Sequence, residues 1–254
     1  MTSHPITVAS YNMRKAIGTD RLRRPERILE VLCEIDADVV ALQEADRRFG
    51  SRTSAIPLSM IESRSPYKPV DFDIRVDGIG WHGNALLVKQ DVEIVGQEPL
   101  KLPTLEPRGA VLADLRIDGA LLRVVGMHLD LSGLWRRRQA RAILQALEKR
   151  DGDPPTVMMG DLNEWSQHGG CLLDFAHGHR FAHTGRSFHA RRPVVGLDRI
   201  MVSRDVTVVA AGAHHSAKAR RASDHLPIWA RLSLGPPGSG TVAARAVAAA
   251  SRSA

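Results

Sequence analysis

The sequence predicts an α/β fold, a four-layer sandwich in which two stacked mixed β-sheets are flanked by helices. Two observations lead to this class. Short runs of β-branched and apolar residues recur along most of the chain, whereas only two segments show clear helical periodicity. So few crossover helices favour stacked mixed sheets over one doubly wound parallel sheet.

Nine strands are expected, each on one short apolar or β-branched run bounded by turn residues. In chain order they are Ile6–Tyr11, Val39–Gln43, Asn84–Lys89, Ala110–Ile117, Leu121–Leu129, Thr156–Gly160, Leu197–Val202, Val206–Ala211 and Ile228–Leu232.

Two helices are expected between these strands. The first begins near Pro25, a residue suited to a first helical turn, and carries apolar residues at helical spacing. The second follows His128 and has an apolar stripe from Ala140 to Leu147. The arginines at its start and on its outer face are expected to be solvated, and they are Arg136, Arg137, Arg138 and Arg141.

The expected organisation is one domain over residues 1–234, followed by a disordered Gly/Pro/Ala-rich tail over 235–254 that has no apolar periodicity. No apolar run approaches the roughly 18 residues needed to span a membrane, and no secretory signal is visible, so a cytoplasmic location is expected. Cys33 and Cys171 have apolar neighbours and are expected to be buried structural thiols.

The formal charge of +7 is compatible with a polyanionic partner. The basic residues are scattered, however, and nucleic acid is therefore a possible partner that the sequence does not favour. The sequence leaves the oligomeric state open.

Several predicted strands end in polar side chains, where most strands would end in ordinary turn residues. One strand runs into Gln43-Glu44, another into His128, and a third into Asp161-Leu162-Asn163. Open α/β scaffolds build their sites from polar groups delivered to one rim in this way.

In their order and residue types these motifs resemble those of the endonuclease/exonuclease/phosphatase superfamily. This superfamily includes deoxyribonuclease I, exonuclease III, neutral sphingomyelinases and inositol polyphosphate 5-phosphatases. The resemblance extends from Asn12 to Leu226. Its pieces are Asn12, Leu42-Gln43-Glu44, Gly83-Asn84-Ala85, His128, Gly160-Asp161-Leu162-Asn163, Leu197-Asp198-Arg199-Ile200 and Ser223-Asp224-His225-Leu226-Pro227.

The resemblance implies a magnesium site, with manganese as an alternative cation. Glu44 resembles the main Mg²⁺ ligand of the family, and Asp224 and Asn12 are candidates to complete the site. Mg²⁺ prefers one or two carboxylates plus waters. Whether one or two metal ions bind stays open.

The resemblance also implies the catalytic residues. Asp161 resembles the residue that orients and deprotonates the attacking water, and His225 the histidine that contacts the scissile phosphate. Asp198 is implied to set the tautomer of His225, which acts either as a general base or as an imidazolium. His128 resembles a second histidine that protonates the leaving oxygen or clamps the phosphate.

Four residues are candidates for substrate binding. Asn12 and Asn163 resemble amides that hold the phosphate and the attacking water. Arg14 follows Asn12 closely, and Arg191 lies in a basic segment shortly before Asp198, so both are candidate phosphate contacts. The remaining histidines lack the paired spacing of a zinc site.

The sequence therefore predicts a metal-dependent phosphoesterase that attacks a phosphodiester or phosphomonoester with water. A lipid headgroup, an inositol phosphate and a nucleotide derivative are the substrate classes considered. The alternative is a nuclease, including an abasic-site endonuclease. A binding module without activity is disfavoured because the residues implied for metal and water are all present.

Overall fold

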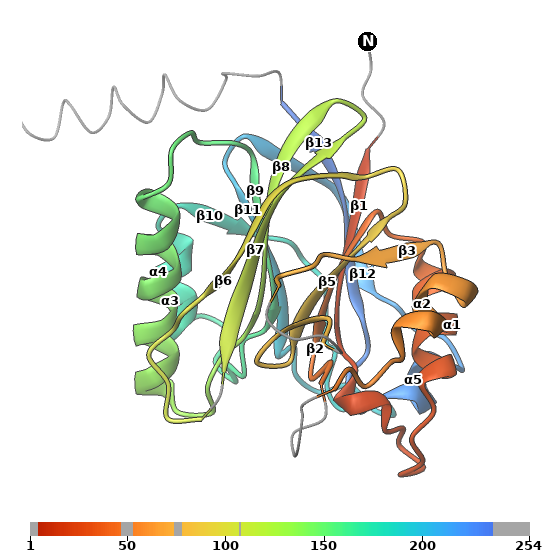
Figure 1. Ribbon diagram of the computed structural model, residues 1–254. Helices are drawn as coiled ribbons and strands as arrows, with labels where there is room; N and C mark the ends of the chain where they lie inside the picture. Colours follow the sequence, from red (N-terminus) through yellow and green to blue (C-terminus); the bar gives the residue numbers. More distant parts are fainter. Residues whose placement is uncertain (1–4, 47–52, 74–77, 107, 236–254) are drawn as a thin grey trace, which may run out of the picture.

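The computed structural model describes residues 5–46, 53–73, 78–106 and 108–235, and it confirms the four-layer α/β sandwich (Figure 1). Two β-sheets stack face to face, and helices cover the outer face of each sheet. None of the helices in the described part of the chain combines the length and apolarity that a membrane span requires.

The first sheet contains both termini of the folded region. Its strand order is β12 (Val206–Ala213), β13 (Ile228–Leu234), β1 (Ile6–Asn12), β2 (Val39–Gln43), β5 (Asn84–Lys89) and β3 (Tyr67–Pro69), with β4 (Gly80–Trp81) also paired to β5. Strands β1 and β2 are parallel, and the other pairings of this sheet are antiparallel.

The second sheet has the order β10 (His179–Phe181), β11 (Asp198–Ser203), β9 (Thr156–Asp161), β8 (Ala120–His128), β7 (Gly109–Ile117) and β6 (Glu93–Leu100). Here β8 and β9 form the parallel pair. Both sheets are therefore mixed, as the sequence predicts.

The helices form the two outer layers (Figure 1). Helices α1 (Pro25–Ile35), α2 (Leu58–Arg64) and α5 (Ala219–Ala222) cover the first sheet, and α3 (Gly133–Glu148) and α4 (Cys171–Ala176) cover the second. A short 3₁₀ helix, η1 (Arg14–Ala16), follows β1. Strands covered on both faces read as continuous apolar runs, and all five residues of β2 are buried.

The predicted strands are all present, and β2 and β5 have the expected bounds. The sequence did not indicate β3, β4, β6 or β10. Strand β6 is an edge strand in which exposed and partly buried residues alternate from Glu93 to Glu98, and it contains Gly96 and Pro99, two residues that are unfavourable within strands. Its stability comes from pairing with β7.

Two expectations about individual side chains were wrong. Arg136 is buried, not solvated, because its guanidinium pairs with the buried carboxylate of Glu164. Cys33 is exposed on α1, whereas Cys171 is buried as expected. Strand β13 ends at Leu234, and residues 236–254 of the predicted tail lie outside the described residues.

The topology brings the polar strand ends to one edge of the sandwich. The parallel pairs β1–β2 and β8–β9 end there, and β11 begins there because Asp198 is paired with Asp161 across antiparallel strands. In the first sheet, β13 begins just after the loop that contains His225. The polar ends of both sheets therefore lie at this edge of the sandwich.

Candidate active site

Asp161, at the end of β9, is the centre of a buried polar cluster between the two sheets. Its Oδ2 accepts a hydrogen bond from Asn12 Nδ2 at 2.9 Å, and its Oδ1 accepts one from the backbone N–H of Asn163 at 2.9 Å. The first bond joins residues from different sheets. With both oxygens engaged, the carboxylate is held in one orientation.

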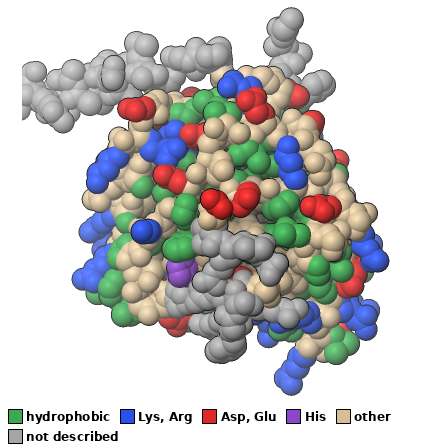
Figure 2. Space-filling model, viewed as in Figure 1, with side chains coloured by type: hydrophobic (Ala, Val, Ile, Leu, Met, Phe, Trp, Pro, Cys, Tyr) green, Lys and Arg blue, Asp and Glu red, His purple; other side chains and the backbone are tan. Residues whose placement is uncertain are grey.

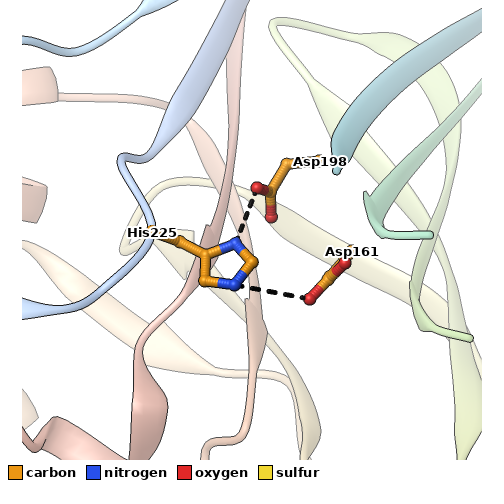
Figure 3. Close-up of side chains that lie close together, drawn as sticks. All are labelled: Asp161, Asp198 and His225. Atoms are coloured by element: carbon orange, nitrogen blue, oxygen red, sulfur yellow. Dashed lines mark hydrogen bonds and ion pairs between the residues drawn. The ribbon is translucent and has the colours of Figure 1, made fainter. Parts of the chain in front are cut away.

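His225 reaches this cluster from the loop before β13 (Figure 3). Its Nδ1 lies 2.8 Å from Asp198 Oδ2, and its Nε2 lies 3.8 Å from Asp161 Oδ2. Ser187 Oγ also donates to Asp198 Oδ2, at 2.5 Å. The carboxylate of Asp198 thus orients the imidazole so that Nε2 faces Asp161, as expected for carboxylate–histidine pairing.

His128 approaches Asp161 from the neighbouring strand β8. Its Nε2 lies 3.5 Å from Asp161 Oδ2, and its side chain is almost completely buried. Arg108 places Nη1 2.8 Å from the Nδ1 of this ring and 2.5 Å from its Nε2. A cation therefore lies directly against the His128 imidazole.

The pKa values of His225 and His128 are shifted in opposite directions. Burial opposes protonation of His225, but the carboxylates of Asp198 and Asp161 outweigh it and raise its pKa to about 10. For His128, burial lowers the pKa to about 3, opposed by Asp161 and reinforced by Arg108. At neutral pH the cluster offers a charged donor at His225 and a neutral imidazole at His128.

Glu44 and Asp224 are partly exposed carboxylates, and each is paired with a cation of η1. Lys15 Nζ pairs with Glu44 Oε2, and Arg14 Nε lies 3.3 Å from Asp224 Oδ2. The backbone N–H of Lys15 also donates to the Glu44 carbonyl at 3.0 Å. Consecutive basic residues therefore neutralise the two carboxylates that the sequence assigns to a metal.

The donor chemistry at this edge fits a hard divalent cation. Glu44 and Asp224 offer carboxylate oxygens and already attract ammonium and guanidinium groups. Asp198 Oδ1 is buried and finds no hydrogen-bond partner among the described residues. Asp161, Asp198 and His225 form a second group whose ligand atoms lie within 4.8 Å of one another. We propose Glu44 as the principal ligand because its carboxylate is partly exposed, whereas Asp161, Asp198 and His225 are buried and already joined to the fold by hydrogen bonds.

Two predicted substrate contacts have other partners. Asn163 directs its Nδ2 to the backbone carbonyl of Leu129 at 2.9 Å, and so it ties the end of β9 to the end of β8. Arg191 is exposed and donates to the carbonyl of Thr19 at 3.1 Å, so it is not part of the Asp161 cluster. Their roles in substrate binding stay predictions.

Sequence reasoning assigned no role to Arg108, Ser187 or Ser223. Ser223 Oγ donates to the Asn12 carbonyl at 2.7 Å and accepts from the His225 backbone at 3.3 Å, which fixes the loop before β13. Its place beside Asp224-His225 was a usable signal. Arg108 offered none, because its contact with His128 depends on the pairing of β7 with β8.

A model of the Endonuclease/Exonuclease/phosphatase family matches residues 9–225 of the chain. Among curated proteins, the uncharacterized protein YbhP of Escherichia coli K12 is 26% identical over 163 residues, which cover 61% of this chain and 64% of YbhP. The match thus spans less than two thirds of that relative.

Solved structures of low sequence identity have the same fold. The mannosyl-6-phosphatase Bt3783 of Bacteroides thetaiotaomicron superposes with a TM-score of 0.69 at 20% identity, covering 90% of this chain and all of that one. TDP2 of D. rerio in complex with a single-strand DNA product also gives 0.69, at 18% identity, covering 91% of this chain and all of that one.

Proposed function

The chain belongs to the endonuclease/exonuclease/phosphatase family of hydrolases, and we propose that it is a divalent-cation-dependent phosphoesterase acting on a small phosphate ester. The observation that carries this proposal is the convergence on one carboxylate. Asp161 Oδ2 lies 2.9 Å from Asn12 Nδ2, 3.5 Å from His128 Nε2 and 3.8 Å from His225 Nε2. Hydrolysis of an anionic ester needs a proton acceptor beside several donors.

Side chains of the Asp161 cluster are proposed to activate the water and to bind the phosphate. Asp161 orients a water molecule and accepts its proton as the water oxygen bonds to phosphorus and the ester P–O bond breaks, and the leaving oxygen takes a proton from solvent. His225, held by Asp198, donates a hydrogen bond to a phosphate oxygen, where negative charge increases. Because His128 is neutral, we propose that it holds the phosphate through a hydrogen bond and does not protonate the leaving oxygen.

Glu44 is proposed as the main ligand of Mg²⁺, or alternatively of Mn²⁺, with Asp224 and Asn12 completing the site. The bound cation supplies positive charge to the phosphate and lowers the pKa of water. Arg14 and Lys15 then become available to the substrate, because the carboxylates that they neutralise would take the cation as counter-ion.

Two observations argue against an abasic-site endonuclease acting on duplex DNA. On the face drawn in Figure 2, lysine and arginine side chains are dispersed among carboxylates and apolar side chains. A duplex-binding surface concentrates basic groups along the phosphate backbone. In addition, at His128-Leu129 the sequence resembles the deoxyribonuclease, sphingomyelinase and inositol phosphatase branches, whereas the exonuclease III branch usually has a tyrosine at the position of His128.

One feature favours a second candidate, a nuclease that acts on single-stranded nucleic acid or on nucleotides. Trp165 is 61% exposed two residues after Asn163, and its ring centroid lies 6.2 Å from that of Phe188. The Phe188 ring in turn lies 4.9 Å from His225. Exposed aromatic rings beside a phosphate site provide stacking surfaces for bases.

A substrate panel separates these candidates. Purified protein would be incubated, with Mg²⁺ or with chelator, with small phosphomonoesters and phosphodiesters, inositol phosphates, phospholipids, single-stranded DNA and a duplex with one abasic site. We expect chelator-sensitive turnover of a small or lipid ester above that of either DNA. Efficient, salt-sensitive incision at the abasic site, exceeding turnover of every small substrate, would contradict the proposal.

The metal assignment has its own test. Glu44→Gln should weaken Mg²⁺ binding in calorimetry at least tenfold and raise the Mg²⁺ concentration needed for activity, because the variant lacks the main anionic ligand. Glu62→Gln, a change at an exposed glutamate of α2, is the matched control. Unchanged Mg²⁺ affinity in Glu44→Gln would remove Glu44 from the site.

A further inference from the structure

A second concavity lies on the other side of β11 from the Asp161 cluster. It has a volume of about 700 Å³ and is bounded by α4, β10, the loop at Gln167 and the segment from Ala182 to Arg186. Cavities that bind small molecules have about this size. No predicted catalytic or metal-binding residue lines it.

The alternation of side chains along β11 separates the two sites. Asp198, Ile200 and Val202 face the space between the sheets, where Ile200 and Val202 join the central core. Arg199 and Met201 face the layer of α3 and α4. Asp198 and Arg199 are therefore neighbours in the chain that serve opposite faces of the sheet.

Arg199 is a partly buried cation that makes no ion pair with any described residue. Its Nη1 donates to the backbone carbonyl of Asp198 at 3.1 Å, and none of the described residues places a carboxylate within ion-pair distance of it. Burial lowers the pKa of this guanidinium, and the more distant carboxylates of Asp198 and Glu164 only partly oppose that effect. A Cβ at Gly196 would lie 2.6 Å from Nη1, so glycine is needed there for this arrangement. A buried charge without a counter-ion is unfavourable.

The walls of the cavity add a second cation and an apolar surface. Arg186, on the rim, also has no carboxylate within ion-pair distance among the described residues. Leu172 and Phe181 form the apolar wall, and Leu173 of α4 is 55% exposed. Exposed apolar area beside unpaired cations is complementary to an amphiphilic anion.

We propose that this cavity binds an organic anion with an apolar body, whose anionic group pairs with Arg199 and Arg186 and whose body packs on Leu172, Leu173 and Phe181. The site is separate from the phosphoesterase centre and does not depend on the identity of its substrate. Its ligand supplies the counter-ion that the protein does not supply to Arg199.

The test uses 1-anilinonaphthalene-8-sulfonate, an apolar sulfonate whose fluorescence rises in apolar surroundings. We expect saturable binding to the full chain at one site. Arg199→Gln should weaken it at least tenfold and Arg186→Gln at least threefold, with Leu173→Ser weakening it as well. Arg116→Gln, at an exposed arginine of β7, and His225→Ala, in the catalytic cluster, should leave it unchanged.

Arg199→Gln alters a partly buried group, so the thermal stability of each variant would be measured beside its titration. If Arg199→Gln unfolds, the variants at the exposed Arg186 and Leu173 test the proposal without it. Wild-type affinity for the probe in all three pocket variants would overturn the proposal. Loss of probe binding in His225→Ala would also overturn it. Competition gives an independent readout: hexanoate should displace the probe, whereas hexanol and inorganic sulfate at the same concentration should not. Displacement by hexanol as strong as that by hexanoate would show that the cations are not used.

Discussion

The buried ion pair between Arg136 of α3 and Glu164 is a polar feature whose disruption should cost substantial stability. Nε and Nη2 of Arg136 both lie 3.2 Å from Glu164 Oε2, and the two side chains are 9% and 7% exposed. Arg136 Nη1 also donates to the carbonyl of Leu131 at 2.6 Å. One guanidinium thus joins the loop after β8 to the loop after β9.

Glu164 is held as firmly as its partner. Its Oε1 accepts the backbone N–H of Ser166 at 3.0 Å. Gly170 has a φ of +59°, and a Cβ there would lie 2.0 Å from Glu164 Oε2, so only glycine allows the carboxylate to approach. The pair therefore fixes the backbone on both sides of Trp165 and next to Asn163.

Glu164→Gln keeps the shape of the side chain and removes its charge, which leaves the Arg136 guanidinium buried without compensation. Breaking a buried pair in this way costs about 3–5 kcal/mol. In a domain of this size each kcal/mol lowers Tm by roughly 2–4 °C, so we expect a fall of roughly 6–20 °C. Urea unfolding at pH 7 measures the free energy directly.

The double variant Arg136→Met/Glu164→Gln distinguishes charge from packing. Without the buried cation it should regain more than half of the lost free energy, because apolar replacements of buried pairs are often neutral. Glu62→Gln is again the surface control. A loss below about 0.5 kcal/mol in Glu164→Gln, the range of ordinary surface substitutions, would refute the reasoning.

Three further predictions follow from the structure. Asp161→Asn and His225→Ala should each lower kcat at least roughly a hundredfold while the fold persists, and near wild-type turnover in either variant would contradict the mechanism. Burial opposes ionisation of Asp174, but two arginines of α3 outweigh it and lower its pKa, so the stabilisation is present above the unfolded pKa of about 3.9 and is lost as pH falls. Asp174→Asn should therefore cost up to about 1 kcal/mol at pH 7 in urea unfolding, because the arginines are exposed, and progressively less as pH falls below the unfolded pKa toward the lowered folded pKa; a cost that does not decrease with falling pH would exclude the ion pair. Deleting residues 235–254 should shift Tm by less than about 5 °C, since that stretch has no apolar periodicity to bury.

Much of the fold follows from local pattern. Strands β2 and β5 have the predicted bounds because every residue of β2 and nearly every residue of β5 is buried, which requires continuous apolar runs. Strand β6 carries a weaker pattern, because half of it faces solvent at a sheet edge. Such a strand forms because a partner is available, and the partner is not encoded nearby in the chain.

The residues of the candidate site could also be predicted only in part from the sequence. Polar residues at strand ends are visible in the sequence, and Asp161, His128 and Glu44 were located from them. Which atoms meet was not visible, since the bond between Asn12 and Asp161 joins residues separated by 149 positions and lying in different sheets.

Arg136 and Arg199 show most clearly what the tertiary structure decided. In the sequence, Arg136 is one of three consecutive arginines and Arg199 is a polar residue inside a strand, and both patterns are typical of solvated side chains. In the fold, Arg136 meets a buried carboxylate from another loop, whereas Arg199 faces a cavity without one. The sequence by itself determines which segments are apolar and where charges follow them. The environment of each charge depends on segments far apart in the chain, because burial and counter-ions are set only when the layers pack together.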